Sequence, residues 1–323
     1  IQLHSRSLRP IKDSYPWGAE LDFGWQYVNE KAWNFCNCYP RVGTALTFWN
    51  WDNRRMLGYG TTAVLYVEPV FLTRHRVNLS IRMGGGLSYL TRPHDEITNP
   101  DNLSYSTYFN FPLMVNVGIN YRLNSHWNVR LAAAYNHVSN GGVHLPNKGI
   151  NYPTMSLGAD YAFQEIDFKE RAKNRDKSPP EKRFRVYTHL MYSFSNADAG
   201  DTKQYGIFGG GANAVYYLGR WSGLSAGAEW VVDGSRRVRI ERQNLDLDHQ
   251  RGSVLFGHQF LLGRVVFSQQ LGVYLYDQFK VNDPVYQRYG LYIKITDNIY
   301  TGINLKSHRH VADFLDLRLG WIF

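Results

Sequence analysis

The sequence predicts an all-β fold, a transmembrane antiparallel β-barrel of the bacterial outer membrane with about 14–16 strands. Three observations favour it. Aromatic residues make up 15% of the 323 residues, with 23 Tyr among them. No stretch approaches the roughly 18–20 consecutive apolar residues of a membrane helix. Instead, apolar and polar residues alternate over most of the chain, as they do in strands that face lipid on one side and a polar lumen on the other.

The alternation is clearest in residues 127–135, 153–163 and 311–323, where the apolar side chains fall on odd positions. Side chains of a strand point alternately to its two faces, so we expect odd positions toward lipid and even positions toward the lumen. A soluble β-sandwich alternates as well, but the aromatic strand ends and the terminal Phe323 favour a membrane barrel. The polar residues expected inside are Asn128, Arg130, Asp160, Asp316 and Arg318.

Breaks in the pattern divide the chain into about sixteen candidate strands, an even number, as in bacterial single-chain barrels. In order they cover 1–8, 17–28, 40–50, 57–71, 76–91, 104–122, 126–138, 152–164, 184–196, 203–218, 221–232, 252–262, 264–277, 285–295, 298–308 and 311–323.

The connections between these strands differ in length. Short turns such as "LLGRV" and "ITDNIY" contrast with long connections at 92–103, 139–151 and 233–250. In barrels of this class the short turns face the periplasm and the long loops face outward, so both termini are expected in the periplasm.

A charged, Pro-containing run, residues 165–183, interrupts the strands and has the composition of a solvated periplasmic linker. The expected domains are therefore a barrel half at 1–164, this linker, and a second half at 184–323 that ends in an aromatic assembly signal. We favour one large barrel because only one such closing signal is present. Two tethered eight-stranded barrels are the alternative.

One stretch, "YNHVSNGGVHLPNKGIN" at 135–151, places polar residues on the face expected to meet lipid. His137 and Ser139 continue the odd register at the outer end of a strand, and Asn151 begins the odd register of the next. Polar groups facing lipid cost free energy unless they are partnered, so the placement needs a reason.

Acyl transfer supplies that reason. A His can draw the proton from a Ser nucleophile while a third group orients the imidazole, which assigns these roles to His137, Ser139 and Asn151. Asn140, Asn147 and the backbone near Gly142 could donate to the developing oxyanion. The substrate would be an ester embedded in lipid, at the level of the outer leaflet.

The stretch resembles the signature of the outer-membrane lipid A 3-O-deacylase family, also called acyloxyacyl hydrolases. The shared features are a His-x-Ser-Asn strand end, a Gly, and a Pro-Asn-x-Gly turn before the next strand. The resemblance covers roughly residues 17–164 and implies Ser139 as nucleophile and His137 as base of a Ser-His-Glu triad. It places Asn140, Gly142 and Asn147 at the oxyanion hole and its support. Residues 184–323 resemble only longer relatives.

The acidic position of that triad falls on Asn151. An amide can orient an imidazole but does not stabilise the imidazolium by charge, so two functions are carried forward. The first is an esterase that removes an ester-linked acyl chain from lipid A. The second is a degraded barrel that binds lipopolysaccharide or serves as a structural subunit, with other outer-membrane proteins on its C-terminal half.

The formal net charge of +9 could suggest nucleic acid, but the basic residues are scattered over turns and loops, so no nucleic acid is expected. Lipid A phosphates and outer-membrane lipids are the simpler partners, and Arg236, Arg237 and Arg239 are candidate phosphate ligands. The pair Cys36 and Cys38 offers too few ligands for zinc. We expect neither a metal site nor a cofactor. In "SHRHVAD" at 307–313, Ser307 and Asp313 are expected toward lipid and His308 and His310 toward the lumen.

Overall fold

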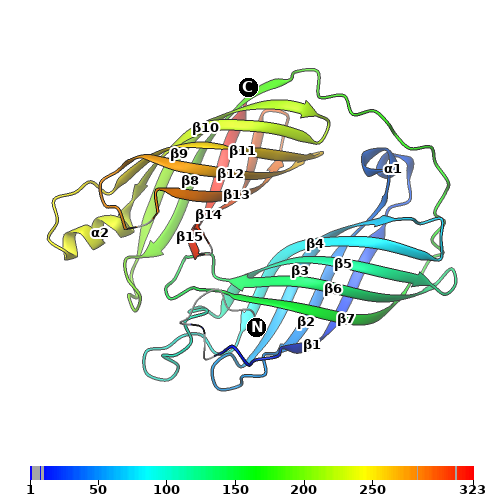
Figure 1. The fold of residues 1–323 in the computed structure, drawn as a ribbon, viewed down its shortest axis with the longest axis horizontal. Helices are drawn as coiled ribbons and strands as arrows, with labels where there is room; N and C mark the ends of the chain where they lie inside the picture. Colours follow the sequence, from blue (N-terminus) through cyan, green and yellow to red (C-terminus); the bar gives the residue numbers. More distant parts are fainter. Residues whose placement is uncertain (2–7, 9–10, 282, 310) are drawn as a thin grey trace. The chain divides into compact units, whose positions relative to one another are not determined.

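The computed structural model describes residues 1, 8, 11–281, 283–309 and 311–323, and it is almost entirely β-structure (Figure 1). The chain forms two compact units, Ile1–Asn140 with Lys148–Arg175, and Gly141–Asn147 with Asp176–Phe323. Within the described ranges, no helix is both long and apolar enough to cross a membrane.

The first unit is a meander of seven antiparallel strands in the order β1 to β7 (Figure 1). A short helix, α1 (Glu30–Cys36), connects the first two strands and is followed by a disulfide between Cys36 and Cys38. The strands are β1 (Trp17–Gln26), β2 (Tyr39–Asn50), β3 (Tyr59–Phe71), β4 (Val77–Leu90), β5 (Phe109–Arg122), β6 (Trp127–Ser139) and β7 (Ile150–Tyr161).

The second unit is a closed eight-stranded barrel in which the last strand pairs with the first strand of the unit (Figure 1). A helix, α2 (Gly234–Arg242), begins at an Asp233 cap in the connection after β10. The strands are β8 (Phe184–Asn196), β9 (Gln204–Gly219), β10 (Ser222–Asp233), β11 (Gln250–Leu262), β12 (Val265–Asp277), β13 (Val285–Lys294), β14 (Ile299–His308) and β15 (Val311–Ile322).

The all-β barrel prediction is confirmed, and its alternating register is confirmed in the burial of the strands. On β6, Arg130 and Ala132 are buried whereas Leu131 and Tyr135 are about half exposed. On β15, Asp316 and Arg318 are buried and the neighbouring Leu317 is exposed. The polar face therefore points inward and the apolar face outward, as a membrane barrel requires.

The single large barrel favoured by the sequence is wrong, because the strands belong to two separate sheets. The alternative of two tethered barrels is closer to the structure, which has eight strands in the second unit and seven in the described part of the first. The strand expected at 1–8 falls mainly on residues outside the described ranges. A period-two pattern gives the facing of a strand but not the identity of its neighbour, which is why the pattern did not reveal the division.

The facing expected for Ser307 and Asp313 is wrong, whereas His308, whose Nε2 lies 3.1 Å from the hydroxyl of Tyr274, faces inward as expected. A β-bulge between Lys306 and Ser307 shifts the pairing with β15 and leaves Asp313 as its extra residue. Asp313 therefore lies 3.2 Å from Arg251 and 3.9 Å from His308 instead of facing lipid, and Ser307 is buried. The extra residue of a bulge departs from the alternation locally, and an alternating pattern does not reveal it. His310 lies outside the described residues.

Charge pairing fills the interior of the first unit. Glu68 of β3 is buried and lies 2.9–3.1 Å from three guanidinium groups, those of Arg41, Arg82 and Arg130. Arg41 of β2 also lies 3.4 Å from Asp160 of β7. In a flat sheet, strands five positions apart would be about 24 Å from each other, so this contact requires the sheet to curl.

We predict that Glu68→Gln destabilises the first unit by about 3–5 kcal/mol, because it removes the buried counter-charge that Arg82 and Arg130 share with the half-buried Arg41. Urea unfolding of the chain in lipid vesicles, followed by Trp fluorescence, measures this. Glu170→Gln is the matched control, since Glu170 pairs with Arg74 at an exposed site and should change stability by less than about 1 kcal/mol. Equal unfolding midpoints for the two variants would contradict a central role for Glu68.

Candidate functional site

Three polar side chains meet at the ends of β6 and β7 in the first unit. Nε2 of His137 lies 3.0 Å from Oγ of Ser139, and Nδ1 of His137 lies 2.6 Å from Oδ1 of Asn151. His137 and Ser139 are two residues apart on one strand, and Asn151 is the direct cross-strand partner of His137. Strand geometry alone therefore brings the three groups into one line.

The residues that alternate with this line hold the strand ends in place. Val138 and Ile150 pair across β6 and β7 and are almost fully buried. They belong to an apolar cluster that also contains Trp51, Tyr105 and Tyr152. Because their side chains point inward, those of His137 and Ser139 must point to the opposite, outer face.

The direction of the hydrogen bonds follows from the groups that make them. The Oδ1 atom of Asn151 is an acceptor, so Nδ1 of His137 carries the proton and donates. Nε2 is then the unprotonated nitrogen and accepts from the hydroxyl of Ser139. This tautomer is the one in which an imidazole can act as a general base toward a serine.

Gly149 is a site residue that the sequence reasoning did not single out. It has a positive φ of 69° and lies against His137 and Ser139: a Cβ there would be 2.6 Å from Cε1 of His137 and 3.3 Å from Cβ of Ser139. Its N–H donates to the carbonyl of Ser104 at 2.8 Å, which fixes the turn. The signal available in the sequence was the glycine of the turn directly before a strand.

The candidate oxyanion residues divide between the two units. Asn140 is fully buried in the first unit, where its amide donates to Oγ of Ser106 at 3.2 Å. Gly142 and Asn147 belong to segment 141–147, which groups with the second unit. The site is therefore described from residues of the first unit alone.

The three candidate phosphate ligands all lie on α2 but differ in accessibility. Arg236 is 3% exposed and is bound to Asp277 and to the carbonyl of Phe279, so it does not reach a surface phosphate. Arg239 binds the carbonyl of Ala197. Arg237 is 61% exposed and pairs with Glu241, one turn further along the helix. The sequence reasoning expected a loop here, and the Asp233-capped helix explains the difference.

Within the described residues, no group of three or more His, Cys, Asp or Glu side chains is arranged to hold a metal ion. The arrangement at Ser139 uses hydrogen bonds between side chains, and it has the geometry required of a serine nucleophile with a histidine base.

Comparisons with known proteins agree with the two-part architecture. The family described as lipid A 3-O-deacylase (PagL) matches residues 13–160, and the family described as acyloxyacyl hydrolase, C-terminal domain, matches residues 184–323. No curated protein matches this chain. A mutant of Rh. blastica porin is 11% identical over 95% of this chain and 91% of its own, with a TM-score of 0.21. A chain from the structure of the FpvAI–pyocin S2 complex is 11% identical over 95% of this chain and 51% of its own, with a TM-score of 0.18.

We predict that Gly149→Ala reduces the reactivity of Ser139 at least about tenfold, because the added methyl displaces the imidazole and a positive φ disfavours alanine. Labelling of the folded protein by a fluorophosphonate, which reacts with activated serines, measures this. Gly158→Ala on β7 is the control, since a Cβ there meets nothing within 4 Å. Unchanged labelling in Gly149→Ala would show that the close approach is not needed.

Proposed function

We propose that this chain, which belongs to the lipid A 3-O-deacylase (PagL) family in a long two-part form, is an outer-membrane esterase that removes an ester-linked acyl chain from lipid A. The observation that carries the proposal is the line of hydrogen bonds from Ser139 through His137 to Asn151 on the outer face of the first unit. It is the arrangement expected for acyl transfer, on the face expected to meet lipid.

The proposed reaction has two steps. Oγ of Ser139 attacks the ester carbonyl while Nε2 of His137 takes its proton, and collapse of the tetrahedral intermediate returns that proton to the departing sugar hydroxyl. Water then attacks the acyl-serine, again with His137 as base, and the fatty acid leaves. The amide of Asn151 holds the imidazole in the required tautomer throughout, at the observed 2.6 Å from Nδ1.

The oxyanion that forms in each step needs donors. We assign this role to the backbone at Gly142 and to Asn147, with Asn140 as a supporting residue, on the strength of the family resemblance in 135–151. The burial of Asn140 and its hydrogen bond to Ser106 suit a supporting residue that positions the loop.

An acyl chain would lie along the outer wall below the site. Going down from His137 and Asn151, the next cross-strand pairs of the outward register are Tyr135–Pro153, Ala133–Met155 and Leu131–Leu157. Met155 and Leu157 are both more than three-quarters exposed. Small Ala133 beside flexible Met155 leaves room for a hydrocarbon chain that displaces lipid rather than water.

The same proposal sets the orientation in the membrane. The site lies at the end of the first unit that carries the long connections, so we assign this end to the outer leaflet and the opposite end, where β7 leads into the linker 165–183, to the periplasm. In the second barrel the C-terminus lies at the end with the short turns, which we also assign to the periplasm. The expectation of a periplasmic N-terminus is not kept, because Ile1 packs against the apolar cluster of Val138 and Ile150 at the same end as the site. Arg237 is the one exposed member of the three candidate arginines and is the remaining candidate for a lipid A phosphate.

A second candidate function rests on Asn151. Because an amide lacks the charge that stabilises an imidazolium, the barrel could bind lipopolysaccharide without cleaving it, or act as a structural subunit of a membrane complex. The experiments that separate the two functions measure fatty acid release and lipid A binding on the same protein.

We predict that Ser139→Ala abolishes release of fatty acid from lipid A, a loss of at least about 10³-fold, while lipid A binding persists. Mass spectrometry of lipid A after incubation with the purified protein measures release. Ser156→Ala, an exposed serine of β7 in the same unit, is the control and should retain activity. If the unaltered chain binds lipid A but releases nothing, the esterase proposal fails and the binding function replaces it.

We predict that Asn151→Asp raises the rate of acyl release about tenfold or more, because a carboxylate in the same position stabilises the imidazolium of the transition state. In a Ser-His-Asp enzyme the reverse change costs about 10⁴-fold in kcat, which sets the upper bound. The rate constant under saturating lipid A is the measurement, and Asn151→Leu is the matched loss-of-function variant. An Asn151→Asp rate no higher than that of the parent would mean that the amide is not a weakened triad member.

A further inference from the structure

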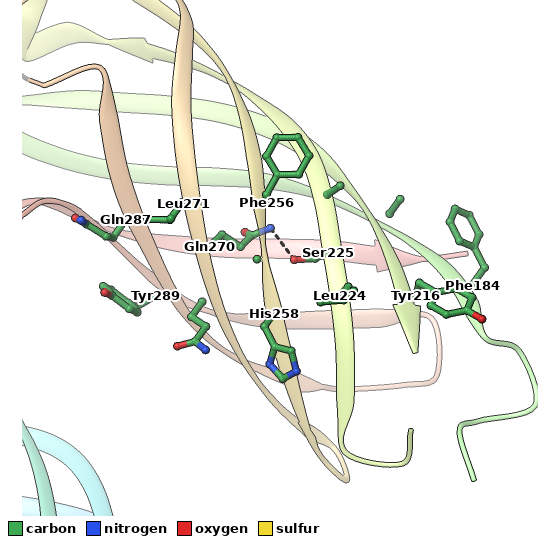
Figure 2. Close-up of a pocket in the computed structure, with 14 residues that line it drawn as sticks. Phe184, Tyr216, Leu224, Ser225, Phe256, His258, Gln270, Leu271, Gln287 and Tyr289 are labelled. Carbon is green, nitrogen blue, oxygen red and sulfur yellow. Dashed lines mark hydrogen bonds between the residues drawn. The ribbon is translucent and has the colours of Figure 1, made fainter. Parts of the chain in front are cut away.

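The outer wall of the closed barrel carries a hollow of about 820 Å³ (Figure 2). It extends over the neighbouring strands β9 to β13, with Phe184 of β8 at its edge. Small outward-facing residues create it: Ala226 of β10 pairs with Ala214 of β9, whereas the β11 partner of Ala226 is the large Phe256. Where the outward side chains are short on two neighbouring strands, the wall is recessed.

The sides of the hollow are apolar and face outward. Tyr216, Leu224, Phe256, Leu271 and Tyr289 line it, and each is between 43% and 61% exposed. Figure 2 shows these side chains on both sides of the recess. A hollow of this size with such walls suits a hydrocarbon chain.

Polar groups lie within this apolar face. Nε2 of His258 and Oγ of Ser222 share a hydrogen bond of 2.7 Å. Gln269 of β12 is the cross-strand partner of His258, and Gln287 of β13 also lines the hollow. Polar side chains on a lipid-facing wall cost free energy unless a partner satisfies them. Nδ1 of His258 is buried and has no hydrogen-bond partner among the described residues, whereas the side chain of Gln269 is exposed on this face.

The rim nearest to these polar groups is basic. His258 and Gln269 lie in the half of the barrel that is nearer to the start of β8. The short β9–β10, β11–β12 and β13–β14 turns lie at the same end. Gln269 is only about 13 Å along its strand from that end. The segments counted are residues 181–183, which lead into β8, and the turns 220–221, 263–264 and 295–298. Their charged residues are four basic and two acidic: Lys182, Arg183, Arg220 and Arg264, with Glu181 and Asp297.

We infer that this hollow binds one anionic glycerophospholipid. An acyl chain fills the recess over Ala226, ester and phosphate oxygens meet His258 and Gln269, and the basic rim attracts the phosphate. The inference rests on the proposed function only in placing this wall in a membrane. It adds a lipid site on the second barrel, at the end opposite the long connections.

Native mass spectrometry of the purified full chain tests the proposal. The Ser139→Ala background removes any lipid hydrolysis, and the probes are phosphatidylglycerol and a diacylglycerol with the same chains. We expect the chain to retain phosphatidylglycerol at least tenfold more than diacylglycerol. Ala226→Trp, which fills the recess, should lower retention of phosphatidylglycerol at least tenfold. His258→Leu combined with Gln269→Leu should reduce the preference for phosphatidylglycerol at least fivefold.

Leu317→Trp is the control, because Leu317 is an exposed outer-wall residue of β15 that does not line the hollow. Equal retention by Ala226→Trp and Leu317→Trp overturns the site, and equal retention of the two lipids overturns the headgroup contact. A dimer that Ala226→Trp dissociates would assign the hollow to a second copy of the chain instead. The retention measurement does not depend on acyl release. If the unaltered chain proves inactive toward lipid A while these retention effects are observed, the deacylase proposal fails and the lipid site remains.

Discussion

The pairing of charges inside each barrel is the constraint on which the rest of the structure depends. Since the outer face of most strands is largely apolar, the charged side chains collect on the inner face and neutralise one another there. Glu68 does this with three arginines in the first unit, and Glu229 with Arg288 and Arg318 in the second. The contacts of Glu68 with Arg130 of β6, and of Glu229 with Arg288 of β13 and Arg318 of β15, join strands that are not neighbours, so they require the sheets to curl around a charged interior.

The site at Ser139 is a local exception to the inward facing of polar side chains. His137, Ser139 and Asn151 are polar groups on the outward register, and they avoid an unpartnered state by bonding to each other. A lipid ester is a substrate that can reach such a group without entering the barrel.

The alternating pattern was enough to predict the facing of the strands and the convergence of His137, Ser139 and Asn151, because both depend only on the two-residue period. It could not predict which strands pair, since closure of the second unit joins β8 to β15 across more than a hundred residues. It also missed the bulge at Ser307 and the helix that buries Arg236, because each depends on one local insertion or cap. Gly149 was interpreted only as the glycine of the Pro-Asn-x-Gly turn, because its role at the site lies in the absence of a side chain.

The two Ser–His pairs on the outer walls differ in what completes them. In the first unit the second imidazole nitrogen is held by Asn151 at 2.6 Å, so the tautomer is fixed and Nε2 is directed at the serine. In the second unit Nδ1 of His258 has no such partner among the described residues, and the pair stands over a recess with a basic rim. A general base needs an orienting group that keeps the proton on the nitrogen remote from the serine, and His258 has none among the described residues. The same two side chains therefore suit acyl transfer in one unit and lipid binding in the other.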